Sequence, residues 1–156
     1  MEDNWQFNHM AVIVKDITTV AKQYESLGGT LGIPRFPSEF FLDSRKYQEY
    51  EVYGKTPETV HLTKVLFVNM NSLLIELMQP IEGETLYREF LDNKGEGFHH
   101  IDFHVDNLEI EQAKLIKKGF PVITKVKFPH GSTIAYFDTS KAFNFIIELT
   151  QISKQK

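Results

Sequence analysis

Short apolar or alternating stretches along the chain predict strands, and segments with helical spacing of apolar residues lie between them. The pattern predicts strands over 7–14, 60–70, 72–78, 98–105, 120–127, 132–138 and 143–151, and helices over 16–27, 84–93 and 108–118. Asp16 stands where an N-cap is expected, and Gly28 and Gly119 follow the first and the last helix as stop signals. This order of elements is typical of an α+β protein rich in antiparallel pairing.

The chain repeats itself. Residues 7–14 (FNHMAVIV) align with residues 98–105 (FHHIDFHV) at an offset of 91 residues, which places His9 on His100. Residues 74–77 (LIEL) align with 146–149 (IIEL) at an offset of 72 residues, which places Glu76 on Glu148. The repeat predicts one domain over 1–156, built from two tandem βαβββ modules at approximately 5–80 and 98–152 with a linker at 81–97.

The two offsets differ, so the first module is 19 residues longer than the second between its His and its Glu. The extra length falls around 30–59 and is rich in aromatic residues. These are Phe36, Phe40, Phe41, Tyr47, Tyr50 and Tyr53. The insertion has two interpretations: it forms a lid or pocket for an apolar group of a substrate, or it covers a sheet edge.

The repeated His and Glu residues predict a metal site. Side chains alternate between the two faces of a strand, and two duplicated modules related by a pseudo-two-fold axis bring equivalent faces together. We therefore expect His9, Glu76, His100 and Glu148 to converge on one divalent ion. Imidazole and carboxylate donors without sulfur suit Zn²⁺, Ni²⁺, Co²⁺, Mn²⁺ or Fe²⁺. Four such ligands leave positions for water or substrate.

Other interpretations of these residues stay open. A His near a strand start is often a surface or capped residue, and the solvent-facing side of an antiparallel sheet is an alternative place for Glu76. A rival ligand cluster consists of His100, Asp102 and His104, which share one face of one strand. Neither Asp102 nor His104 has a counterpart in the first module, where Ala11 and Ile13 stand.

Composition and charge exclude several classes of function. A hydrophobic fraction of 42% with 24% charged residues is typical of a globular protein. The net charge of −4 and the lack of a long Lys/Arg run argue against a nucleic-acid partner. The apolar stretches are far shorter than the ~20 residues that span a bilayer, and the acidic segment 1–4 is unlike a signal peptide. The absence of Cys excludes a disulfide framework, and we expect a cytoplasmic protein without a membrane partner.

Three segments resemble the vicinal oxygen chelate superfamily, which includes glyoxalase I (lactoylglutathione lyase), methylmalonyl-CoA epimerase, bleomycin-resistance proteins and extradiol dioxygenases. They are FNHMAVIVKD at 7–16, IELMQPIEGETLYREFLDNKGEGFHHIDFHVDN at 75–107 and FIIELTQ at 145–151. The resemblance implies a cupped, mostly antiparallel glyoxalase-like sheet around a metal ion. It also implies that His9, Glu76, His100 and Glu148 are the ligands, with His100 rather than the adjacent His99.

The resemblance implies a metal-dependent lyase or isomerase that acts through an enediolate on a small substrate with vicinal oxygens or a thioester. Epimerases of this family carry a carboxylate on the strand before the second ligand, but residues 60–68 contain no acid. A glyoxalase-type scheme requires less, because there a ligand carboxylate, Glu148 or Glu76, also acts as the base. Glu76 argues against an extradiol dioxygenase, which uses two His and one Glu. The family also implies a homodimer, and its resistance proteins offer an alternative function, ligand binding without catalysis.

Overall fold

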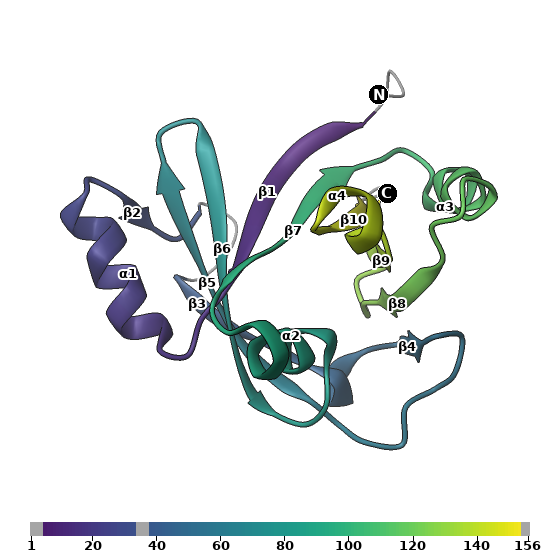
Figure 1. Ribbon diagram of the computed structural model, residues 1–156, viewed down its shortest axis with the longest axis horizontal. Helices are drawn as coiled ribbons and strands as arrows, with labels where there is room; N and C mark the ends of the chain where they lie inside the picture. Colours follow the sequence, from purple (N-terminus) through teal and green to yellow (C-terminus); the bar gives the residue numbers. More distant parts are fainter. Residues whose placement is uncertain (1–4, 34–37, 154–156) are drawn as a thin grey trace. The chain divides into compact units, whose positions relative to one another are not determined.

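The computed structural model of the protein describes residues 5–33 and 38–153 (Figure 1). Its described strands are β1 (Gln6–Ile13), β2 (Thr30–Leu31), β3 (Glu39–Asp43), β4 (Glu49–Val52), β5 (Leu62–Met70), β6 (Leu73–Glu82), β7 (Gly97–His104), β8 (Val122–Lys127), β9 (Thr133–Phe137) and β10 (Ile146–Gln151). Its described helices are α1 (Ile17–Ser26), α2 (Leu86–Lys94), α3 (Leu108–Lys117), α4 (Ser140–Phe143) and the 3₁₀ turn η1 (Ser44–Lys46). The order confirms the α+β class and the repeated βαβββ pattern, with α2 between the two copies.

The chain divides into two compact units that do not follow the sequence in one piece. The first, which we call the N-terminal unit, comprises 9–45 and 59–99. The second, the C-terminal unit, comprises the described residues up to Asn8, residues 46–58, and the described residues from His100 onward. Strands β1 and β7 each supply residues to both units.

In the N-terminal unit the strands follow the order β2-β5-β6-β1, and β3 also pairs with β5. The β1–β6 pair is parallel and places Ala11 opposite Glu76, whereas the other pairs are antiparallel. Asp16 is the N-cap of helix α1, and its carboxylate accepts hydrogen bonds from the backbone N–H groups of Thr18 and Thr19, both at 3.1 Å. Its apolar face packs on this sheet. The buried core comprises Val14, Ile17, Ala21, Leu66, Val68, Ile75 and Leu77.

The C-terminal unit repeats this plan with the order β7-β10-β9-β8-β4. The β7–β10 pair is parallel and places Asp102 opposite Glu148, and the remaining pairs are antiparallel. Asn107 caps α3 by accepting a hydrogen bond from the Ile110 N–H at 3.1 Å. The buried core comprises Val105, Leu108, Leu115, Ala135, Phe137 and Leu149. The mostly antiparallel pairing expected from the sequence is therefore present in both units.

The insertion forms β2, β3, η1 and β4, and β2 pairs with β5. Strand β3 pairs with β5 in the N-terminal unit, and β4 pairs with β8 in the C-terminal unit, where Tyr50 lies opposite Val126. The described part of the insertion therefore supplies an edge strand to each unit. Phe36, one of the aromatic residues of the insertion, lies outside the described residues.

Two elements end elsewhere than the sequence pattern predicts. Strand β6 continues to Glu82 through Pro80, which lies beyond Met78, the last residue in register with β1, and whose carbonyl accepts a hydrogen bond from Arg88 Nη2 at 2.8 Å. Strand β10 begins only at Ile146, since residues 140–143 form the short helix α4 and Asn144 then adopts a left-handed conformation with φ of 63°. In the described part of the chain, no helix is long and apolar enough to cross a membrane.

Candidate metal centre

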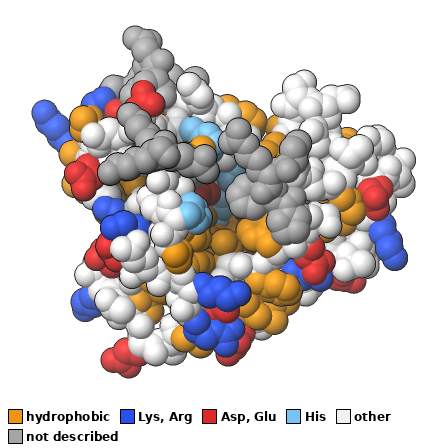
Figure 2. Space-filling view, turned by 180° about the vertical axis from the view of Figure 1, so that it is seen from behind, with side chains coloured by type: hydrophobic (Ala, Val, Ile, Leu, Met, Phe, Trp, Pro, Cys, Tyr) orange, Lys and Arg blue, Asp and Glu red, His pale blue; other side chains and the backbone are white. Residues whose placement is uncertain are grey.

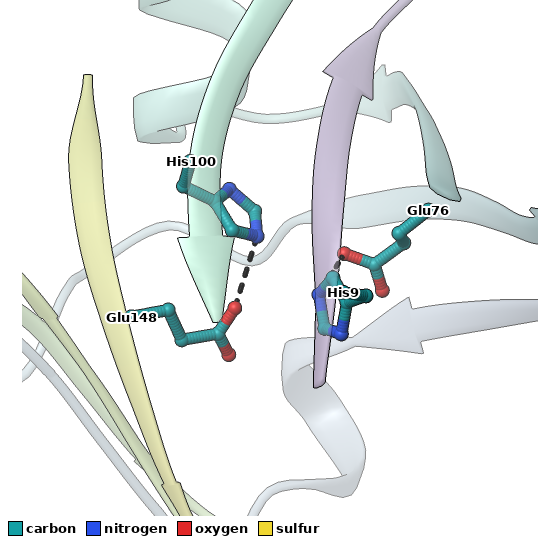
Figure 3. A group of neighbouring side chains, drawn as sticks. All are labelled: His9, Glu76, His100 and Glu148. Carbon is teal, nitrogen blue, oxygen red and sulfur yellow. Dashed lines mark ion pairs between the residues drawn. The ribbon is translucent and has the colours of Figure 1, made fainter. Parts of the chain in front are cut away.

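The N-terminal unit holds one of the two predicted His–Glu pairs. His9 on β1 and Glu76 on β6 lie on adjacent parallel strands, and His9 Nε2 is 3.2 Å from Glu76 Oε2 (Figure 3). The two residues are only 5% and 6% exposed. This burial contradicts the interpretations of His9 as a surface residue and of Glu76 as a solvent-facing one.

The C-terminal unit holds the second pair at the equivalent place. His100 on β7 and Glu148 on β10 again lie on adjacent parallel strands, with His100 Nε2 2.9 Å from Glu148 Oε2 (Figure 3). His100 is 0% exposed and Glu148 is 4% exposed. The alignment made from the sequence therefore matches residues that are equivalent in space within each unit.

An aromatic ring contacts each imidazole in the same way. Phe67 lies opposite Glu76 across the β5–β6 pair, and its ring meets that of His9 edge to face at a centroid distance of 5.6 Å. Tyr136 lies opposite Glu148 across the β9–β10 pair, and its ring meets that of His100 at 5.2 Å. Each ring restricts the orientation of its imidazole. The sequence reading missed Phe67 and Tyr136 because they differ in type and lie outside the matched strings.

The donor set fits a divalent ion of borderline softness. Burying ionisable groups in a sheet interior is costly unless they are paired with each other or bound to a cation. In both pairs an imidazole nitrogen and a carboxylate oxygen point at each other from neighbouring strands. Two imidazoles and two carboxylates without sulfur suit Zn²⁺ and its first-row neighbours.

The rival cluster on β7 takes a different form. Both carboxylate oxygens of Asp102 accept hydrogen bonds from side chains: Oδ2 from Asn8 Nδ2 at 2.6 Å, and Oδ1 from Thr150 Oγ1 at 2.9 Å. His104 is only half-buried. Asp102 is thus hydrogen-bonded to side chains on both strands next to β7.

His61 is a further buried ionisable residue, and it was not predicted from the sequence. His61 directly precedes β5, and its backbone N–H donates to Ser44 Oγ at 2.8 Å. Burial lowers the pKa of His61 to about 4, against the opposing effect of the Asp43 carboxylate. The imidazole is therefore neutral near pH 7. No sequence signal marks it, because its burial depends on η1 and on the segment at Gly83 packing against it.

Comparison with known proteins places these features in a family. Residues 8–137 match the family described as the Glyoxalase/Bleomycin resistance protein/Dioxygenase superfamily. The chain belongs to this superfamily. The resemblance to vicinal oxygen chelate proteins drawn from the sequence is therefore confirmed.

Individual relatives with a stated activity are epimerases. The mitochondrial methylmalonyl-CoA epimerase of Bos taurus is 26% identical over 94% of this chain and 74% of its own length. An ethylmalonyl-CoA/methylmalonyl-CoA epimerase of Cereibacter sphaeroides is 25% identical over 94% of this chain and 98% of its own. This chain is therefore similar along most of its length to proteins that catalyse an isomerase-type reaction.

Solved structures show the same fold. A hypothetical protein from Bacillus halodurans superposes with a TM-score of 0.67 at 21% identity, covering 97% of both chains. Methylmalonyl-CoA epimerase from Mycobacterium tuberculosis superposes with a TM-score of 0.66 at 19% identity, covering 96% of this chain and 89% of its own. The glyoxalase-like architecture is thus established by structure as well as by sequence pattern.

Proposed function

We propose that the protein is a metal-dependent isomerase or lyase that removes a proton next to a carbonyl group, forming an enediolate of its substrate. The observation that carries the proposal is the buried His–Glu pair found at the same place in both modules. The similarity to epimerases supports the isomerase type of reaction.

The donor set of the proposed centre is His9, Glu76, His100 and Glu148. In this proposal they bind one divalent ion, Zn²⁺, Ni²⁺, Co²⁺, Mn²⁺ or Fe²⁺, and the ion with two neutral imidazoles and two carboxylates is formally neutral overall. When bound, such an ion supplies Lewis-acid stabilisation of negative charge that develops on a substrate oxygen.

We assign the role of general base to Glu148. Glu148 lies opposite Asp102 in the register of the β7–β10 pair, whereas Glu76 lies opposite Ala11 in that of the β1–β6 pair. The two ligand carboxylates therefore have unequal surroundings, with a polar residue opposite Glu148 and an apolar one opposite Glu76. The carboxylate then returns the proton to the substrate carbon, with the buried walls of the site limiting exchange with water.

Two substrate classes fit this chemistry. A related-fold methylmalonyl-CoA epimerase has been solved in complex with methylmalonyl-CoA, and that of Streptomyces coelicolor in complex with 2-nitronate-propionyl-CoA. By this likeness the first class is a 2-substituted acyl-CoA thioester. The second is the adduct of an α-ketoaldehyde with a thiol, in which two neighbouring oxygens are available for chelation.

The test combines metal analysis with proton exchange. Protein purified without chelators is expected to hold about one ion per chain. In D₂O, the metal-loaded protein should exchange the hydrogen next to the carbonyl of one substrate class, measured by NMR. If the protein binds metal and substrate but does not exchange the hydrogen, the ligand-binding alternative is favoured. If it neither binds metal nor exchanges the hydrogen, the proposal is contradicted.

Variants sharpen this test. His100→Ala should abolish metal binding and exchange, while His130→Ala provides a matched control, because His130 is an exposed His of the same unit.

The homodimer implied by the family stays a prediction, and light scattering coupled to size exclusion measures it directly.

A further inference from the structure

A fully buried carboxylate lies beside the C-terminal pair. Asp102 is 0% exposed, yet each of its oxygens accepts a hydrogen bond from a neutral side chain. Asn8 Nδ2 donates to Oδ2 at 2.6 Å and Thr150 Oγ1 donates to Oδ1 at 2.9 Å. One carboxylate therefore joins side chains of three strands, β1, β7 and β10.

These three residues flank proposed metal ligands in the sequence. Asn8 directly precedes His9, Asp102 follows His100 by two residues, and Thr150 follows Glu148 by two residues. A spacing of two keeps Asp102 on the strand face of His100, and Thr150 on that of Glu148. The hydrogen bonds of Asp102 thus fix the backbone next to three of the four proposed ligands.

The first module has no equivalent arrangement. Ala11 occupies the place of Asp102, and Met78 occupies the place of Thr150, as the parallel registers Ala11–Glu76 and Asp102–Glu148 show. Ala11 and Met78 are both fully buried hydrocarbon-rich side chains. A polar residue at this place is therefore a feature of the second module alone, and its hydrogen bonds reach Asn8 and Thr150, which lie next to proposed ligands.

We infer that Asp102 is a positioning residue for the metal centre, which orients the ligands His9, His100 and Glu148 through its hydrogen bonds to Asn8 and Thr150. This inference rests on the proposed function, because it presupposes that these residues bind a metal ion. Outer partners that orient metal ligands affect affinity by about 10- to 100-fold.

The experiment uses Co²⁺ alone as the probe, with its affinity measured by calorimetry and its ligand geometry by visible absorption. Asp102→Asn should raise the dissociation constant for Co²⁺ by about 10- to 100-fold and change the absorption spectrum. Glu111→Gln is the matched control. Glu111 is also a buried carboxylate of the C-terminal unit with two side-chain partners, Trp5 Nε1 at 2.9 Å and Lys114 Nζ at 2.9 Å. It should lower thermal stability while leaving the Co²⁺ affinity and spectrum unchanged.

A pair of substitutions at Thr150 keeps the test decisive if Asp102→Asn does not fold. Thr150→Val keeps the branched shape and removes the hydroxyl donor, so Co²⁺ binding should weaken, and Thr150→Ser should restore it. Wild-type affinity and spectrum in Asp102→Asn, or in Thr150→Val, would overturn the inference and leave the proposed function standing. Failure of the wild-type protein itself to bind Co²⁺ overturns the proposed function.

Discussion

The His9–Glu76 pair and the His100–Glu148 pair have the same local arrangement in the two units. Both place an imidazole and a carboxylate on adjacent parallel strands, and both set an aromatic ring edge-on to the imidazole. They differ in what lies opposite the Glu on the imidazole strand, which is Ala11 in the N-terminal unit and Asp102 in the C-terminal unit.

This difference separates what the duplication preserved from what it changed. The residues that can bind a metal are the same in both copies, whereas the residues around them are apolar in one and polar in the other. Equivalent ligands in unequal surroundings can perform unequal tasks. We therefore expect the two Glu residues to differ in function even though their positions match.

The largest expected effect is a difference in turnover between variants of the two ligand carboxylates, Glu148 and Glu76. Glu148→Gln should lower turnover by about 1,000-fold with metal still bound, because the amide cannot accept the substrate proton. Glu76→Gln should lower turnover by about 10-fold or less at saturating metal, since an amide oxygen can still act as a ligand. Turnover and metal content are measured on the same preparations. Equal losses in the two variants would show that the carboxylates share one role.

A substitution at Ala11 tests the unequal surroundings directly. Ala11→Asp introduces a carboxylate at the place that corresponds to Asp102. Met78 stands at the place of Thr150 in this module, so the new carboxylate has no hydroxyl donor from that position. The free energy of unfolding should fall by about 3 kcal/mol, as expected for a buried charge that lacks compensation. Urea denaturation measures this loss. A much smaller change would mean that the N-terminal unit tolerates the polar arrangement of its counterpart.

Metal binding tests whether the two pairs act on one ion. Zn²⁺ at 100 times its dissociation constant should stabilise the wild-type protein by about 2.7 kcal/mol. For a chain of this size this corresponds to a rise in Tm of about 5 to 10 °C. His9→Ala and His100→Ala should each remove the rise. If one of them retained it in full, the pairs would be separate sites.

The two units also differ in the His that lies six residues before the aromatic residue of the site. His61, six residues before Phe67, is buried, and its pKa is lowered to about 4; His130, six residues before Tyr136, is exposed. In the unfolded chain the pKa of His61 is near 6.5, so between this value and the folded value of about 4 the unfolded chain binds more protons than the folded one. The free energy of unfolding is therefore highest above about pH 6.5 and falls as the pH drops toward 4. The loss should reach about 2 kcal/mol at pH 5. Denaturation curves of His61→Gln should lack this loss, and those of His130→Gln should retain it.

The sequence was sufficient for the elements that occur twice. The matched strings around His9 and His100, and around Glu76 and Glu148, test each other, so the strands and their order could be predicted from alternation and offset together. The first helix was equally accessible, because its N-cap Asp16 and the glycine after it are local signals.

Features that depend on distant packing were not accessible. Strands β3 and β4 lie in the insertion, which has no copy in the second module to confirm a weak alternation. The ring contacts of Phe67 and Tyr136 and the burial of His61 arise from neighbouring strands and loops. The hydrogen bonds of Asp102 join residues 94 and 48 positions apart in the sequence, and no local pattern predicts them.

Because β4 pairs with β8, the chain cannot be cut between the two repeats without removing a strand from the sheet of the C-terminal unit. Residues 46–58 belong to the C-terminal unit, although the segments on both sides of them belong to the N-terminal unit. Two fragments divided between the repeats would each be incomplete: the first would carry a strand without its sheet, and the second would expose the N–H and C=O groups of β8. Covalent continuity across the repeats is therefore a requirement of this architecture, and a split version of the protein would have to place its break elsewhere.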